Sequence, residues 1–372
     1  MIKKSIALFE KEHPGINVKP EFQEYEDFWK KFATQASGGG APDVFQNAAA
    51  FMRKYGDRKT LLDLSSQVDK GNLDMKGFRA GLEKAGEVDG KLWGVPVGAN
   101  TFSLIYDVEA FERIGVEPGM GWTWDDYEKA VDKLKAEGFQ ATTPAGVMYH
   151  YDLLLRQQGK QFFTEDGQLG FGKADLTAHW KEQYAGIEDG RFVPQKKADQ
   201  IAPKALLSAG FSKSEYQWDN FIVRFSAEAE EEGKFALAPL PTTDGKKTGQ
   251  YLSSLFLSGY AKTRHPEEVA KFIDFMVHDP EVGKIMGYNR GILATEEQYD
   301  AFEPTGPDKM IAEYEEKVEK AGVIEPMTPQ PDGTDVVEAA LLRIWQDVAH
   351  GKKSVDEGVD QFFSEAEQAL GS

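Results

Sequence analysis

Hydrophobic positions along the chain follow two periods, one typical of amphipathic helices and one of buried strands. The helical period predicts helices over residues 2–11, 25–40, 48–57, 124–138 and 265–279, and two more within 333–370 that meet at Gly351. Apolar extended runs predict strands over 16–22, 42–46 and 101–107 and an extended pair within 234–261. This succession of strands and helices predicts an α/β fold with largely buried sheets.

Short polar signals mark where several of these elements begin or turn. Thr123 and Asp126 have the spacing of a capping box at the start of a helix. Asp89-Gly90 and Asp244-Gly245 each stand between extended runs, which predicts two tight turns. The region from about 141 to 233 is expected to be mostly helical.

Length and charge narrow the class of protein. A chain of 372 residues with 41% hydrophobic residues is long enough for two packed domains. The 43 basic and 62 acidic residues give a net charge of −19, which disfavours binding to nucleic acid or to anionic lipid. No apolar run reaches the ~20 residues of a membrane span. Cysteine is absent, which excludes disulfides and thiolate chemistry.

Signatures of hydrolases and metal sites are missing from the sequence. It contains no HExxH, no GxSxG and no calcium-loop spacing, and its six histidines include no i, i+4 pair. A glycosidase would need two facing carboxylates, but 62 acids form pairs by chance. The acidic runs at 228–233, 266–269 and 313–320 are expected to be solvated surface.

Polar and aromatic residues gather instead at the ends of apolar segments. They occur as "FQN" (45–47), "GAN" (98–100), "MYHYD" (148–152), "YQWDN" (216–220) and "YNRG" (288–291). Aromatic faces stack on the C–H faces of sugar rings, and amide or carboxylate groups bond to hydroxyls, so this set suits an uncharged polar ligand. Each residue taken alone could equally be a core aromatic or a loop residue.

An ordered set of segments resembles the extracellular solute-binding proteins of sugar-importing ABC transporters, the family that includes maltose-binding protein. Among them are "APDVFQNAAAFMRKYGDRKTLLDL", "GKLWGVPVGANTFSLIYD", "WTWDDYEKA" and "SGYAKTRHPEEVAKFIDFMV". The segments span nearly the whole chain in the family's order, although no single motif is decisive.

The resemblance implies an α/β, two-lobed periplasmic-binding-protein-like fold of type II, with discontinuous lobes joined by a hinge. One lobe is expected to comprise residues 1–106 and 260–300, and the other 107–259 and 301–372. A saccharide would bind in the interlobe cleft, and closure would present it to the permease subunits of the transporter. The resemblance implies no cofactor, no metal and no catalysis, and the protein is expected to be a monomer.

Single positions carry over from the family. Trp218 and Tyr149 fall where the family places ring-stacking aromatics, and Asn100 and Asn47 fall at polar contact positions. The other residues expected to line the cleft are Asp219, Asn220, His150, Asp152 and Arg290.

Three positions depart from the maltose-binding member of the family. Ala50 and Phe51 stand where that member has a charged pair, and Glu338 stands where it has a late stacking aromatic. These departures argue against maltodextrins as ligands.

The beginning of the chain departs most from the family. Family members start with a strand that enters the first lobe's sheet, whereas this chain starts in the helix that follows it. We expect a shortened chain that has lost this strand and an export signal; alternatively, the chain works without the strand or borrows one from another chain. The native protein is expected at the cell surface, held by a lipid anchor, or in the periplasm.

The sequence therefore predicts a non-enzymatic carbohydrate-binding component of an ABC importer. Two alternatives stay open, a carbohydrate-active enzyme with a carboxylate pair in the cleft and a surface adhesion protein.

Overall fold

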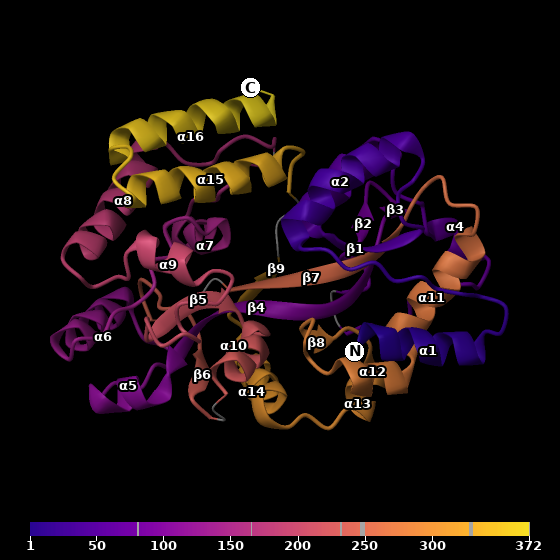
Figure 1. The fold of residues 1–372 in the computed structure, drawn as a ribbon, viewed down its shortest axis with the longest axis horizontal. Coiled ribbons are helices and arrows are strands. Elements are labelled where there is room, and N and C mark those ends of the chain that lie inside the picture. The colour runs from indigo at the N-terminus through magenta and orange to yellow at the C-terminus, as the bar shows by residue number, and fades with distance from the viewer. Residues whose placement is uncertain (80–81, 165, 231–232, 246–249, 327–329, 372) are drawn as a thin grey trace. The chain divides into compact units, whose positions relative to one another are not determined.

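The computed structural model describes residues 1–79, 82–164, 166–230, 233–245, 250–326 and 330–371 (Figure 1). The chain divides into two compact units, each discontinuous in sequence: Met1–Ala99 with Ser253–Pro304, and Asn100–Leu252 with Thr305–Ser372. We call them unit 1 and unit 2. The chain passes between them near residues 99, 252 and 304, a few residues from the expected 106, 259 and 300, and the division into lobes that move as bodies stays a prediction.

Unit 1 is built from helices around short strand pairs. Its elements are α1 (Ile2–Glu12), α2 (Tyr25–Gly38), β1 (Val44–Ala48), α3 (Ala49–Asp57), α4 (Ser65–Asp69), β2 (Glu87–Val88), β3 (Lys91–Leu92), α11 (Pro266–His278), α12 (Pro280–Met286), β8 (Ile292–Leu293) and α13 (Glu296–Ala301). It also contains the start of β4 (Val95–Asp107) and most of β7 (Gln250–Gly259). The tight turn at Asp89-Gly90 is confirmed, because β2 and β3 pair antiparallel around it and both residues have positive φ.

Antiparallel pairs hold the sheet of unit 1 together. β1 pairs with β7 from Val44↔Gly259 to Ala48↔Leu255, and β4 pairs with β8 at Gly98↔Leu293. Beside β1, the rings of Trp29 and Phe51 stack with centroids 3.7 Å apart. The period-3.6 pattern of α2 and α3 therefore buries one face of each helix in a common aromatic core.

The strand predicted over residues 16–22 is wrong. These residues form no ladder with another strand in the described part of the chain; the backbone N–H of Val18 instead donates to the Glu10 carboxylate at 2.8 Å. Extended backbone becomes a strand only when a neighbour completes its hydrogen bonds. Within the described ranges β1 pairs with β7 alone, and the expected loss of an earlier strand stays a prediction.

Unit 2 surrounds a second sheet with more helices. Its elements are the remainder of β4 and β7, α5 (Val108–Arg113), α6 (Trp124–Ala136), α7 (Met148–Gln157), α8 (Lys173–Glu188), α9 (Gln195–Ile201), β5 (Ser214–Trp218), α10 (Phe221–Ala229), β6 (Phe235–Ala238), α14 (Gly306–Ala321), β9 (Ile324–Pro326), α15 (Thr334–Ala349) and α16 (Val355–Leu370). The capping box of α6 is confirmed, because the Thr123 hydroxyl accepts from the Asp126 N–H and the Asp126 carboxylate accepts from the Thr123 N–H.

β4 organises the sheet of unit 2. It pairs antiparallel with β5 from Phe102↔Trp218 to Tyr106↔Ser214, and with β6 at Leu104↔Ala238. The apolar strand predicted over 101–107 is confirmed and begins earlier, at Val95. The two extended runs predicted as a pair within 234–261 are both strands, but their partners differ: β6 pairs with β4, and β7 pairs with β1, β4 and β9. The predicted turn runs from Asp244-Gly245 into residues 246–249, which lie outside the described residues.

A core of large side chains lies beneath α15 and α16. Trp180 of α8 is fully buried, lies 5.6 Å from Trp345 of α15 between ring centroids, and donates its indole N–H to the Ala145 carbonyl at 3.0 Å. The two predicted C-terminal helices are confirmed, with Gly351 at positive φ between them. In the described parts of the chain, no helix has both the length and the apolar character to cross a bilayer.

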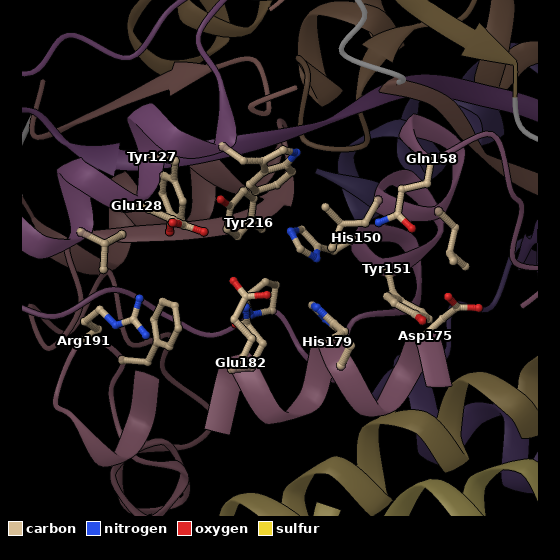
Figure 2. Close-up of a pocket in the computed structure, with 18 of the residues that line it drawn as sticks. Tyr127, Glu128, His150, Tyr151, Gln158, Asp175, His179, Glu182, Arg191 and Tyr216 are labelled. Carbon is tan, nitrogen blue, oxygen red and sulfur yellow. The ribbon is translucent and has the colours of Figure 1, made fainter. Parts of the chain in front are cut away.

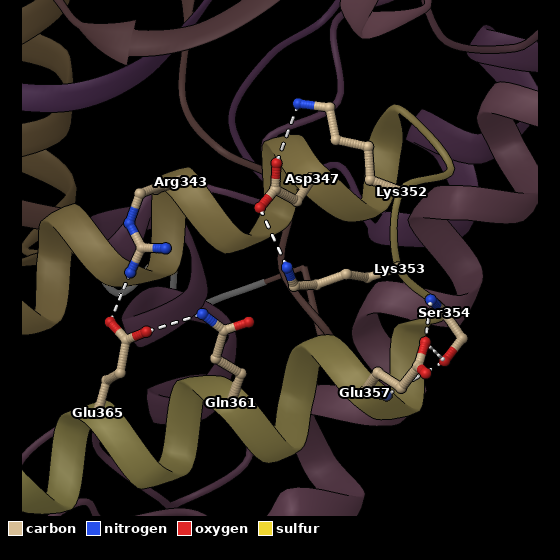
Figure 3. Close-up of polar contacts among 8 residues, drawn as sticks. All are labelled: Arg343, Asp347, Lys352, Lys353, Ser354, Glu357, Gln361 and Glu365. Atoms are coloured by element: carbon tan, nitrogen blue, oxygen red, sulfur yellow. Dashed lines mark hydrogen bonds and ion pairs between the residues drawn. The ribbon is translucent and has the colours of Figure 1, made fainter.

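Figure 3 shows how polar side chains join α15 to α16. Asp347 accepts from Lys352 and Lys353 in the connection, and Arg343 pairs with Glu365 across the two helices. At the start of α16 the Ser354 hydroxyl accepts from the Glu357 N–H at 3.2 Å, and the Glu357 carboxylate accepts from the Ser354 N–H at 2.9 Å. This capping box satisfies N–H groups that the first turn of a helix leaves without a partner.

Replacing Ser354 with Ala should lower the free energy of unfolding by about 1 kcal/mol, because a helix N-terminus then loses its side-chain acceptor. Urea unfolding of the purified protein measures the change. Ser364→Ala is the matched control, since Ser364 is exposed in the middle of the same helix. Equal stability of the Ser354→Ala protein and the parent would show that the cap does not stabilise α16.

Candidate functional site

The two aromatic residues expected to stack on a ligand lie together in unit 2. Trp218 ends β5, where its pairing with Phe102 of β4 fixes its position. The Trp218 ring lies 5.2 Å from the ring of Tyr149 on α7 and 5.3 Å from that of Phe102, between centroids. Phe102 is fully buried, whereas Trp218 and Tyr149 are half-buried. The pair therefore has a buried base and partly accessible rings.

Asp219 and Asn220 follow this pair at the start of α10. Asp219 is fully buried; its N–H donates to the Thr101 carbonyl at 3.0 Å and one carboxylate oxygen accepts from the Asn220 N–H at 2.7 Å. Asn100 of β4 is also buried, and its side-chain oxygen has no hydrogen-bond partner among the described residues. Asn100 therefore has acceptor capacity left, while Asp219 holds the turn between β5 and α10.

A buried carboxyl pair lies behind this turn. Burial raises the pKa of Asp219 well above its usual value, and the carboxyl group of Glu315 on α14 raises it further. Glu315 is 6% exposed, so the interpretation of residues 313–320 as a solvated surface is wrong at this position. Burial and the neighbouring carboxyl group thus both favour the protonated form of Asp219.

His150 and Asp152 of α7 point into the body of unit 2. His150 is buried against Tyr216, with ring centroids 4.6 Å apart, and burial lowers its pKa well below the usual value. The Asp152 carboxylate accepts from the Phe162 N–H at 2.7 Å and from Arg156 at 3.3 Å. His150 thus packs on Tyr216, Asp152 links α7 to Phe162, and their role as ligand contacts stays a prediction.

Asn47 and Arg290 belong to unit 1. Asn47 is 1% exposed, and its amide donates to Ser258 at 3.0 Å and to the Met52 sulfur at 3.1 Å while its oxygen accepts from the Ala48 N–H. Arg290 is half-buried and donates to the Asn289 side chain at 3.3 Å; burial lowers its pKa. Asn47 thus stabilises the end of β1, and its expected contact with a ligand is untested.

Several buried polar residues of unit 2 were missed by sequence reasoning. They are Glu315, His179 on α8 and Tyr216 on β5. A usable signal existed for Glu315, because its neighbours Ile311 and Val318 follow the helical period and mark the buried face of α14. No comparable local signal marks His179, whose surroundings come from other segments.

Glu315→Gln should reduce the loss of stability on raising the pH. A carboxyl whose pKa is raised in the folded state binds its proton more tightly there than in the unfolded chain, so stability falls as the pH rises from the ordinary Asp value toward the raised pKa. Without the second carboxyl this dependence should weaken. Thermal unfolding of the parent and the variant between pH 5 and pH 9 measures it.

Glu316→Gln serves as the control, because Glu316 is exposed and forms an ion pair with Lys320 on the surface of the same helix. The stability of this control should depend on pH in the same way as that of the parent. Identical slopes for Glu315→Gln and the parent would show that the Glu315 carboxyl group does not raise the pKa of Asp219.

Relatives of known name resemble the chain over most of its length. A multiple sugar-binding protein of Streptococcus mutans is 24% identical over 306 residues, which is 74% of this chain and 67% of that protein. An arabinooligosaccharide-binding protein of Bacillus subtilis is 28% identical over 260 residues, covering 67% of this chain and 58% of that protein.

Solved structures match the fold. An ABC substrate-binding protein of Listeria monocytogenes in complex with cycloalternan, 19% identical, superposes with a TM-score of 0.85 over all of this chain and 95% of its own. The predicted two-lobed α/β solute-binding fold is therefore confirmed.

The family of bacterial extracellular solute-binding proteins matches residues 1–281, about three quarters of the chain. The match agrees with the order of segments from which the resemblance was inferred. The chain therefore belongs to the bacterial extracellular solute-binding protein family.

Proposed function

We propose that the protein is the carbohydrate-binding component of an ABC importer, which binds a mono- or oligosaccharide and delivers it to membrane permease subunits. The observation that carries the proposal is the pair of half-buried rings, Trp218 and Tyr149. The buried ring of Phe102 packs against Trp218 and holds it in place. Sugar rings have apolar C–H faces that gain free energy on such aromatic surfaces. Relatives named for sugars and arabinooligosaccharides support the same ligand class.

Polar residues near the pair would select among hydroxyl patterns. Asn100 has an acceptor with no partner in the described chain, and Asn220 begins α10 directly after the Trp218 turn. Arg290 and Asn47 would contribute from unit 1 if the two units close on the ligand, as the fold class implies. Native localisation at the cell surface or in the periplasm, and action as a monomer, belong to the same proposal.

Catalysis by a carboxylate pair is disfavoured by burial. The carboxyl pair near the site, Asp219 and Glu315, is 0% and 6% exposed, and one oxygen of Asp219 accepts from the Asn220 N–H. A glycosidase needs both acids at a scissile bond. Incubation with a glycan panel should therefore leave the glycans intact, and released product would contradict the binding function.

Trp218→Ala should weaken saccharide binding by about 1–3 kcal/mol, roughly 5- to 150-fold in Kd, because the ring face is lost. A thermal-shift screen of mono- and oligosaccharides first identifies a ligand through the stabilisation that binding produces. Calorimetric titration of that ligand then measures the affinity of each variant.

Phe211→Ala provides the matched control. Phe211 is a large aromatic residue of unit 2, 39% exposed and covered by Lys197, away from the Trp218 pair. Its removal should leave the affinity unchanged. Unchanged binding by Trp218→Ala, with the control also unchanged, would show that the ligand does not stack there.

A further inference from the structure

A cavity of about 410 Å³ lies in unit 2, and His150 is among the residues that line it (Figure 2). Its walls come from α6, α7, α8 and β5. Its volume falls within the roughly 300–1,000 Å³ typical of small-molecule sites. The side chains that decide its chemistry are Trp124, Tyr127, His150, Tyr151, His179 and Tyr216.

Side chains that line this cavity carry buried polar atoms without partners. Both ring nitrogens of His150, Nε2 of His179 and the hydroxyl of Tyr151 have no hydrogen-bond partner among the described residues. These three side chains are 2%, 8% and 3% exposed. Figure 2 shows His179 extending from α8 toward His150 on α7. Buried polar groups left unpaired are costly, so a row of them around one cavity indicates a partner that fills it.

The side chains of His150, His179 and Tyr151, which we call the inner wall of the cavity, are uncharged at neutral pH. Burial lowers the pKa of His179 to about 4 and that of His150 well below its usual value, so both rings are neutral. Burial also raises the pKa of the Tyr151 hydroxyl, which keeps its proton. A neutral imidazole has one donor and one acceptor, and a phenol can act as either. The wall thus offers mixed donors and acceptors, as a hydroxylated ring requires.

The charged residues around the cavity disfavour anions. Glu128 and Glu182 are exposed at its edge, and the pKa of Glu182 is raised by burial and by the charge of Glu128. Arg191 also lines the cavity, but it is paired with Asp189 at 2.9 Å.

The negative charge of Asp175, a carboxylate that lines the cavity, is already balanced by hydrogen-bond donors. Asp175 accepts from Lys160 at 2.6 Å and from the Gly172 N–H at 2.9 Å. Among the described residues no third His, Asp or Glu joins His150 and His179 in a metal-binding group. A neutral organic molecule therefore fits the wall better than an anion, an amine or a metal ion.

We propose that this cavity is a second binding site, distinct from the Trp218 and Tyr149 pair, for one small uncharged polyhydroxylated ring such as a monosaccharide or cyclitol. The aromatic residues Trp124, Tyr127 and Tyr216 provide apolar faces, and the histidines and Tyr151 provide hydrogen bonds to hydroxyls. The inference rests on the cavity and does not depend on what binds at Trp218.

Selective labelling of the histidine rings gives a direct test, because His150 and His179 lie in the wall. The probes are a panel of neutral rings (glucose, galactose, mannose, arabinose, xylose and myo-inositol), with glucuronate as the anionic and glucosamine as the cationic counterpart of glucose. At least one neutral ring should shift the NMR signals of both histidines saturably. Glucuronate and glucosamine should bind at least tenfold more weakly than the best neutral ring.

Ala178→Phe should weaken this binding at least tenfold. Ala178 lines the cavity from α8 and is exposed, so the larger ring narrows the entrance without entering the core. Ala185→Phe is the matched control, the same change at an exposed position of the same helix outside the cavity lining. His179→Phe keeps an aromatic ring in place, removes the donor and acceptor, and should also abolish the binding.

The outcome separates this site from the proposed transport site. Ala178→Phe should leave binding at Trp218 intact, and Trp218→Ala should leave the histidine shifts intact. The proposal is overturned if no neutral ring shifts both histidines, which would mean that the cavity holds only water. It is equally overturned if glucosamine or glucuronate binds best, or if Ala178→Phe behaves like Ala185→Phe.

Discussion

The register between β4 and β5 is the constraint on which the candidate site depends. Pairing of Phe102 with Trp218 places the indole over a buried phenylalanine, and it places Asp219 where its N–H meets the Thr101 carbonyl. Side chains alternate between the two faces of a strand, so a slip of one residue would send Trp218 to the opposite face. Buried Ser214 and Tyr216 alternate with the partly exposed Glu215 and Gln217 along β5, so such a slip would also carry Tyr216 out of the core.

Several of the polar residues expected to bind a ligand form hydrogen bonds that stabilise the fold. Asn47 uses its whole side chain inside unit 1, and Asp152 ties α7 to the loop at Phe162. The Asp219 carboxylate does the same between β5 and α10. A binding protein gains from this arrangement, because protein side chains that are already held in place lose little conformational entropy when a ligand binds.

Local signals in the sequence predicted much of the fold. The apolar run before Asp107, the capping box at Thr123 and the Asp89-Gly90 turn each carry their own physical cause within a few residues. The strand over 16–22 failed for the opposite reason, since an extended run needs a partner that local pattern cannot provide.

Less of the candidate site could be predicted from the sequence. The aromatic pair could be predicted, because the resemblance named Trp218 and Tyr149, and the structure brings their rings together. The burial of Glu315 and the cavity around His179 could not, since both depend on packing between segments far apart in the chain. A titratable residue on a helix is predicted to be exposed until the element that covers it is known.

The wall formed by α7 and β5 carries two surfaces at once. Tyr149 and His150 are consecutive on α7, and Tyr216 and Trp218 lie two residues apart on the same face of β5; in each pair one residue belongs to the aromatic pair and the other lines the cavity. The two sites therefore share packed residues in this wall, and the effects on the free energy of unfolding of two substitutions within it should not add. Such a wall can change its ligand preference only through compensated replacements, which makes it slow to diverge compared with a surface that has one role.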